Sequence, residues 1–111
     1  MLPKEKRINR ELFEIIFKKG ERRENIFFRA VFLSSEKQRF SIVLSKKVEN
    51  KATKRNTIKR KISSLLEEKI KNKEAVGVNI IFFVKKLGNK KEYKEWFEKI
   101  WREIMFVDRD K

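Results

Sequence analysis

The side chains of this sequence limit the chemistry that the protein can perform. The chain contains no histidine and no cysteine, which excludes imidazole bases, thiol nucleophiles, disulfides and zinc fingers. Its only aspartates, Asp108 and Asp110, stand near the C-terminus, and no cluster of carboxylates along the chain is typical of a two-metal site. We therefore predict no catalytic side chain, and no metal site on the protein alone.

Basic side chains are instead the functional groups that dominate the sequence. Lysine and arginine number 31 against 16 acidic residues, which gives a formal net charge of +15. A charge of this size repels itself unless a polyanion neutralises it, so a nucleic acid is the favoured partner. Hydrophobic residues make up 40% of the chain and stand in periodic blocks, which indicates a folded protein and not a disordered one.

The positive charge is concentrated in residues 46–61, which hold eight basic residues and one acidic residue, Glu49. A helix is predicted to begin here, so its first turns carry cations where free backbone N–H groups prefer acidic side chains. Its apolar stripe becomes continuous only at Ile58, so we expect those turns to project beyond the core and to bind phosphates. A solvated helix face is the alternative interpretation. The predicted RNA-binding residues are Lys46, Lys47, Lys51, Lys54, Arg55, Asn56, Lys59, Arg60 and Lys61.

A second candidate surface combines aromatic rings with cations. Phe13 and Phe17 lie four residues apart on a predicted N-terminal helix and are followed by basic residues. Such a groove suits single-stranded nucleic acid, because bases stack on aromatic rings while the backbone follows the positive charge. Burial of both rings in the core is the alternative. With the odd-numbered face of the predicted sheet as its floor, the cleft is expected to comprise Phe13, Phe17, Lys18, Arg29, Val31, Ser41 and Ser45.

Hydrophobic spacing predicts the elements that position these residues, in the order α-β-β-α-β-α. The helices are expected from Asn9, as cap, to Gly20, from about Ala52–Lys54 to Lys71, and from Asn89 to Phe106; the strands are expected at residues 25–34, 39–45 and 76–84. We expect the first two strands to form a hairpin and the third, buried on both faces, to lie parallel to a neighbour after a helical crossover. The second and third helices are expected to cover the even-numbered face of the sheet.

These elements predict one α+β domain over residues 1–111, an α/β sandwich on a mixed sheet, with frayed ends at about residues 1–7 and 107–111. The longest apolar run, Ile80 to Val84, is too short to cross a bilayer, and the N-terminus lacks the apolar core of a signal peptide. We therefore expect a cytoplasmic protein without a membrane partner, which is monomeric when free.

The stretch RFSIVLSKKVENKATKRNTIKRKI, residues 39–62, resembles the signature region of the bacterial ribonuclease P protein. In that family a Ser-Lys-Lys strand end leads into an Arg-Asn-Arg helix, and the likeness extends to LFEIIFKKG near the start of the chain. Arg55 and Asn56 match the first two positions of the motif, whereas Thr57 stands at the third. With threonine at the third position, one phosphate contact of the motif lacks its cation. Lys54 is the candidate to supply this charge, at a different angle on the helix.

The resemblance implies a sheet of three to four strands in the order α-β-β-(β)-α-β-α. It implies a left-handed β-α-β crossover, which the general preference for right-handed crossovers would not suggest, and a short strand near Glu21 to Glu24. It further implies that the catalytic RNA of ribonuclease P and precursor tRNA are the partners. The holoenzyme is an endonuclease that removes the 5′ leader of precursor tRNA with Mg²⁺ held mainly by the RNA, and the protein is an accessory subunit.

By this resemblance, the catalytic RNA is faced by Arg55, Asn56, Lys59 and Arg60, with Lys46 and Lys47 nearby, and the leader groove is flanked by Phe13 and Phe17. A ribosomal-type structural RNA-binding protein without a role in tRNA processing is the main alternative, because the same charge and sheet would serve it. A protein nuclease with its own metal site and a DNA-binding module are weaker alternatives, the latter because the basic residues encircle the predicted helix and form no single reading face.

Overall fold

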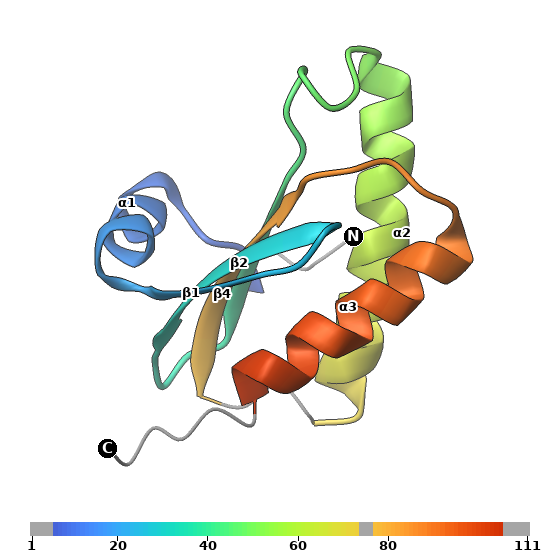
Figure 1. The fold of residues 1–111 in the computed structure, drawn as a ribbon. Coiled ribbons are helices and arrows are strands. Elements are labelled where there is room, and N and C mark those ends of the chain that lie inside the picture. The colour runs from blue at the N-terminus through green and yellow to red at the C-terminus, as the bar shows by residue number, and fades with distance from the viewer. Residues whose placement is uncertain (1–5, 74–76, 106–111) are drawn as a thin grey trace.

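The computed structural model describes residues 6–73 and 77–105, and their architecture is a sheet between two helical layers (Figure 1). Helices α2 and α3 pack on one face of the sheet, and α1 packs on the other. The predicted α+β class is confirmed, as is the short strand near Glu21 to Glu24. The elements are α1 (Arg10–Lys19), β1 (Glu21–Glu24), β2 (Phe28–Ser34), β3 (Arg39–Val43), α2 (Ala52–Lys71), β4 (Val78–Val84) and α3 (Lys90–Met105).

The ends of α1 are fixed by the two residues that the sequence indicated. The side-chain oxygen of Asn9 accepts a hydrogen bond from the Leu12 amide at 2.9 Å, and the Gly20 amide donates to the Ile16 carbonyl at 2.7 Å. Gly20 has φ −73°, so its role is space and not a left-handed backbone. A Cβ there would lie 2.5 Å from the Ile16 carbonyl oxygen and 2.8 Å from that of Phe32.

The bounds of the other elements also follow from local hydrogen bonds. Helix α3 begins with a reciprocal pair, in which the Asn89 side chain accepts from the Glu92 amide at 2.8 Å and the Glu92 side chain accepts from the Asn89 amide at 3.0 Å. Strand β2 begins at Phe28 and not at Asn25, because the Asn25 side chain accepts the amides of Phe27 and Phe28 in a turn. The predicted helix end at Phe106 and strand start at residue 76 lie outside the described residues.

The strand order is β1-β2-β4-β3, with β4 antiparallel to β2 and parallel to β3. The predicted parallel pairing across the helical crossover is confirmed. The predicted hairpin between residues 25–34 and 39–45 is wrong, because β4 lies between those two strands. Six of the seven β4 residues are buried, and an inner position gives this apolar strand hydrogen-bonded partners on both edges and helices on both faces.

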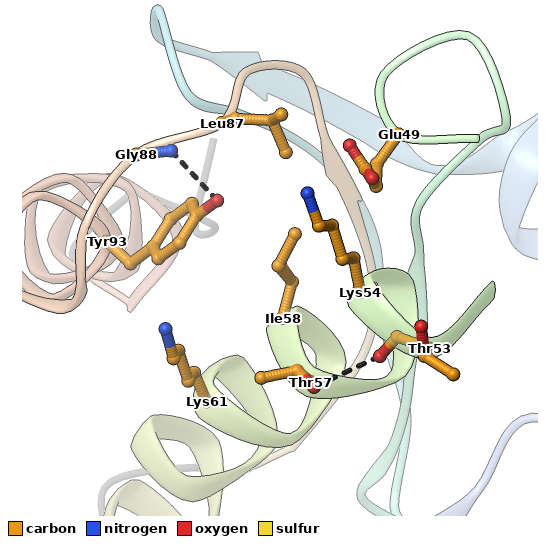
Figure 2. A pocket seen from close by; sticks show the side chains of 9 residues that line it. All are labelled: Glu49, Thr53, Lys54, Thr57, Ile58, Lys61, Leu87, Gly88 and Tyr93. Carbon is orange, nitrogen blue, oxygen red and sulfur yellow. Dashed lines mark hydrogen bonds between the residues drawn. The ribbon is translucent and has the colours of Figure 1, made fainter. Parts of the chain in front are cut away.

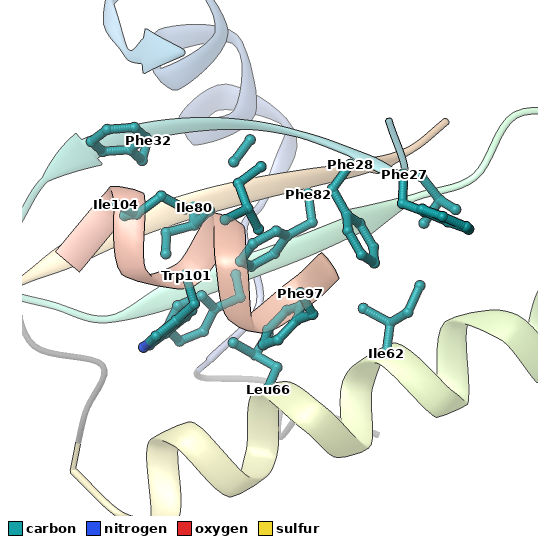
Figure 3. Close-up of a cluster of buried hydrophobic side chains, with 14 of the residues drawn as sticks. Phe27, Phe28, Phe32, Ile62, Leu66, Ile80, Phe82, Phe97, Trp101 and Ile104 are labelled. Atoms are coloured by element: carbon teal, nitrogen blue, oxygen red, sulfur yellow. The ribbon is translucent and has the colours of Figure 1, made fainter. Parts of the chain in front are cut away.

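The main core lies on the even-numbered face, under α2 and α3, as predicted (Figure 3). Phe28 and Phe82 of the sheet meet Phe97 of α3, with ring centroids 6.0 and 5.2 Å from it, and Ile62 and Leu66 of α2 complete the contact. On the other face a smaller cluster forms where Ile16 of α1 packs on the sheet.

The N-terminal end is ordered further than the sequence suggested. Arg7 pairs with Phe40 in a parallel bridge, and the Ile8 amide donates to the Phe40 carbonyl at 3.2 Å, so the prediction of a frayed segment reaching residue 7 is wrong. Residues 1–5 and 106–111, which include the predicted frayed tail, lie outside the described part. Among the described residues, no helix is long and apolar enough to cross a membrane.

We expect Gly20→Ala to destabilise the protein by about 1–3 kcal/mol, because the added methyl group would overlap backbone oxygens of α1 and β2. At a glycine without such contacts, substitution by alanine usually stabilises the protein, because alanine reduces the conformational entropy of the unfolded chain. Urea denaturation measures the difference. Lys19→Ala, at the exposed neighbouring position, is the control, and a Gly20→Ala midpoint equal to or above that of the wild type would contradict the packing argument.

Candidate nucleic-acid interface

The N-terminal half of α2 projects beyond the sheet (Figure 1), as its apolar spacing predicted. Residues 51–54 are all exposed, and the first buried side chain of the helix is that of Ile62. The N-cap residue, Lys51, makes no side-chain capping bond, and the first turn contains no acidic residue. Backbone N–H groups and cations therefore face solvent together, which is an arrangement that a phosphate backbone stabilises.

The predicted RNA-binding residues divide by exposure. Those that are half-buried are Arg55, Lys59 and Lys61, and those that are exposed are Lys46, Lys47, Lys51, Lys54, Asn56 and Arg60. We call the nine residues together the basic surface. The structure brings all of them to one end of the molecule, along the first turns of α2 and the loop that precedes it. They lie on more than one side of the helix, since Lys54 and Lys61 are on the side of Tyr93, whereas Lys59 lies beside Arg7 and Phe40.

Arg55 and Thr57 have local partners that the sequence did not reveal. Nη1 of Arg55 donates to the carbonyl oxygens of Glu49 at 3.0 Å and Asn50 at 2.9 Å, so this arginine braces the preceding loop against α2. The Thr57 hydroxyl donates to the Thr53 carbonyl at 3.0 Å within the helix. Thr57 thus contributes no cation where the resembled motif has one, and Arg55 has a structural role beside any contact with RNA.

An aromatic patch lies on the opposite layer of the sheet, and we define it by Phe13, Phe17 and Phe83. The rings of Phe13 and Phe17 are nearly parallel, at 8° with centroids 6.3 Å apart, and both meet Phe83 edge-on at 6.2 and 6.1 Å. Phe17 is 40% exposed, and the Arg22 guanidinium lies 4.7 Å from its ring centroid. The Arg22 guanidinium therefore lies over the Phe17 ring, and the exposed part of the patch combines an aromatic surface with a cation, which suits single-stranded nucleic acid.

Phe83 is the residue of this patch that sequence reasoning missed. It stands on the odd-numbered face of β4 with Ile81, and in the sheet it is in register with Arg29 of β2 and Val43 of β3. Strand alternation predicts the face of the sheet on which Phe83 lies, but only the correct strand order places Phe83 under α1.

The other residues of the predicted cleft have separate positions. The assignment of Val31 to the cleft is wrong, because Val31 is fully buried in the cluster that Ile16 of α1 forms with the sheet. Lys18 and Arg29 are exposed and Ser41 is half-buried, whereas Ser45 lies beyond the end of β3, where its carbonyl accepts the amides of Val48 and Glu49. The structure therefore joins the aromatic residues to one another more closely than to the polar ones.

One carboxylate balances the cations at the end of β1. Glu24 pairs with Lys85 and with Nε of Arg29, the latter at 3.1 Å, and Lys85 also donates to the Asn25 carbonyl at 2.9 Å. These hydrogen bonds, that of Lys85 first, lower the pKa of Glu24 from its ordinary value of 4.5. In residues 6–73 and 77–105, no group of three or more acidic, histidine or cysteine side chains is placed to hold a metal ion.

The fold and these two surfaces define a small α+β protein with an exposed basic helix end and a partly exposed aromatic patch. The Ribonuclease P family model matches residues 2–105, and the chain belongs to this family. It is therefore a protein subunit of the ribonucleoprotein enzyme that processes tRNA, as the resemblance implied, and the alternative of a ribosomal-type protein is not supported. No curated protein matches the chain.

Two solved structures illustrate the similarity. The first is the structure of a Staphylococcus aureus RNase P protein mutant with defective mRNA degradation activity. Its sequence is 23% identical to this one, and the match covers 93% of this chain and 90% of that chain with a TM-score of 0.76. The second is the RNase P protein from Thermotoga maritima, which is 28% identical with a TM-score of 0.61 over 89% of this chain and 87% of that chain.

The contacts of Glu24 predict a specific pH dependence of stability. Because its pKa is lowered in the folded state, its stabilising contribution is present above pH 4.5 and is lost as the pH falls through the folded-state pKa. Glu24→Gln should therefore be less stable than the wild type at pH 6, and the difference should shrink at pH 3. Urea denaturation at both pH values tests this, with Glu21→Gln on the same strand as control. A difference that is the same at both values would contradict the ion-pair account.

Proposed function

We propose that the basic surface binds the catalytic RNA of ribonuclease P and that the aromatic patch binds the 5′ leader of precursor tRNA. The observation that carries the proposal is the exposed start of α2, where cations replace the acidic and capping residues that a helix N-terminus prefers. Such a helix end is unfavourable alone and favourable against phosphates. We further propose that the protein is cytoplasmic and is monomeric until it binds the catalytic RNA.

The position of the sheet supports two separate RNA contacts. Helix α2 lies on one face of the sheet and α1 on the other, so the basic surface and the aromatic patch belong to opposite layers (Figure 1). An RNA on α2 leaves the exposed part of Phe17, on the other layer, accessible to a second strand. We propose on this ground that the protein holds catalytic RNA and substrate together, while Mg²⁺ bound mainly by the RNA serves the cleavage.

Reconstitution tests the proposal directly. Bacterial ribonuclease P RNA and precursor tRNA are mixed at low Mg²⁺ with and without this protein, and we expect the protein to increase the rate of cleavage at the mature 5′ end. The protein and precursor tRNA without the catalytic RNA form the control and should give no cleavage. Unchanged cleavage on addition of protein would refute the proposal, and cleavage by the protein alone would assign the chemistry to its own side chains.

The aromatic patch predicts a substrate-specific mutant. Phe17→Ala should weaken binding of leader-containing precursor tRNA to the holoenzyme about 10-fold, because one stacked base is worth roughly 1–3 kcal/mol. Binding of tRNA without a leader should not change. Ile15→Ala is the matched control, since Ile15 is 46% exposed on the same helix but has no part in the patch. Equal loss for both substrates, or an equal effect of Ile15→Ala, would count against the assignment.

A further inference from the structure

A hollow of about 360 Å³ lies between the N-terminal half of α2 and the loop that joins β4 to α3 (Figure 2). Its volume is at the lower end of the roughly 300–1,000 Å³ range of small-ligand sites. Its lining residues come from two segments, 49–61 and 87–93, which are far apart in sequence. The walls that matter for its chemistry are formed by Lys54, Ile58, Lys61, Leu87, Gly88 and Tyr93.

One wall of the hollow carries apolar surface at Leu87 and at Ile58, whose side chain packs against the edge of the main core. Leu87 is 42% exposed, one of four large hydrophobic side chains that are exposed in the described part of the chain. It lies across the hollow from Ile58, which is half-buried at the centre of the lining (Figure 2). Exposed apolar surface beside cations is unfavourable in water, and a flat apolar group between the two side chains would cover it.

The other part of the hollow supplies hydrogen-bond donors. The ammonium groups of Lys54 and Lys61 point into the space from α2 (Figure 2). The Tyr93 hydroxyl oxygen accepts the Gly88 amide at 2.9 Å, which leaves its own proton for an acceptor in the hollow. Tyr93 is 1% exposed, and burial raises its pKa, so the hydroxyl remains protonated at neutral pH. These three donors suit the oxygens of a phosphate.

The charges also give the hollow an orientation. Glu49 lines the wall away from Tyr93 and next to Lys54, whereas Lys61 points toward Tyr93 (Figure 2). A phosphate is therefore favoured on the side of Lys61 and Tyr93, away from the Glu49 carboxylate. The apolar pair, Ile58 and Leu87, is then left for the remainder of the ligand.

We propose that this hollow binds one unpaired nucleotide of the catalytic RNA, with its phosphate beside Lys61 and Tyr93 and its base between Ile58 and Leu87. The proposal rests on the function proposed for α2 and adds a specific pocket to a surface that otherwise reads only backbone charge. A free anion would leave Leu87 uncovered, and an apolar ligand would leave the Lys61 ammonium and the Tyr93 hydroxyl without an acceptor. A nucleotide satisfies both parts.

The test compares binding of bacterial ribonuclease P RNA by three variants over a range of salt concentrations. Leu87→Ser should weaken binding roughly 3- to 10-fold with an unchanged salt slope, because it removes apolar contact and no charge. Ile26→Ser is its matched control, since Ile26 is 53% exposed and outside the hollow, and it should have no effect. Arg60→Gln, on the exposed side of the same helix, should reduce the salt slope by about 1.

The outcomes separate the pocket from the function on which it rests. If Arg60→Gln lowers affinity and slope while Leu87→Ser binds like the wild type, the nucleotide pocket is refuted and RNA binding by α2 stands. If neither variant has an effect, both proposals fail. Circular dichroism of each variant shows whether it is folded. If Leu87→Ser does not fold, the NMR titration of the wild-type protein described next decides whether the pocket exists.

Binding of small probes to the wild-type protein tests the same pocket without substitution. In NMR titrations, adenosine 5′-monophosphate should shift the methyl signals of Ile58 and Leu87 at lower concentration than adenosine or inorganic phosphate does. Inorganic phosphate acting as well as the nucleotide would show a site for anions alone, and the absence of shifts with every probe would show no site. Either result would overturn the proposal.

Discussion

The burial of β4 on both faces is the constraint on which the rest of the structure depends. Ile80 and Phe82 enter the main core under α2 and α3, while Ile81 enters the smaller cluster under α1. An apolar strand of this kind is stable only inside a sheet that helices cover on both sides. The position of β4 therefore sets α1 and α2 on opposite layers, and with them the two surfaces on which the proposed function depends.

The same constraint allows α2 to be basic at one end. Its C-terminal half is anchored in the core by Ile62 and Leu66 and to α3 by the ion pair between Lys69 and Glu98, whose charged atoms are 2.6 Å apart. The buried half holds in place an N-terminal half whose charges repel one another and oppose the helix dipole. Arg55 contributes at the junction by bonding two carbonyls of the preceding loop. The C-terminal half of the helix therefore supplies stability, and the RNA binding that we propose belongs to its N-terminal half.

Local features of the chain were predictable because their causes are local. The Asn9 cap, the helical spacing of α2 and α3 and the acid-free first turn of α2 each depend on residues within a few positions of one another. Charge density likewise predicted a polyanion partner, and the residues around Arg55 and Asn56 indicated the family that the comparison then confirmed.

The sequence by itself therefore determined the helices, the basic segment and the family, whereas the tertiary structure decided which surfaces exist. The strand order depends on pairing between distant segments, and the strand alternation of β2 and β3 did not show that β4 would lie between them. For the same reason the burial of Val31, the place of Phe83 in the aromatic patch and the position of Leu87 across the hollow from Ile58 could not be predicted. Each results from packing between elements, and packing leaves no local pattern in the chain.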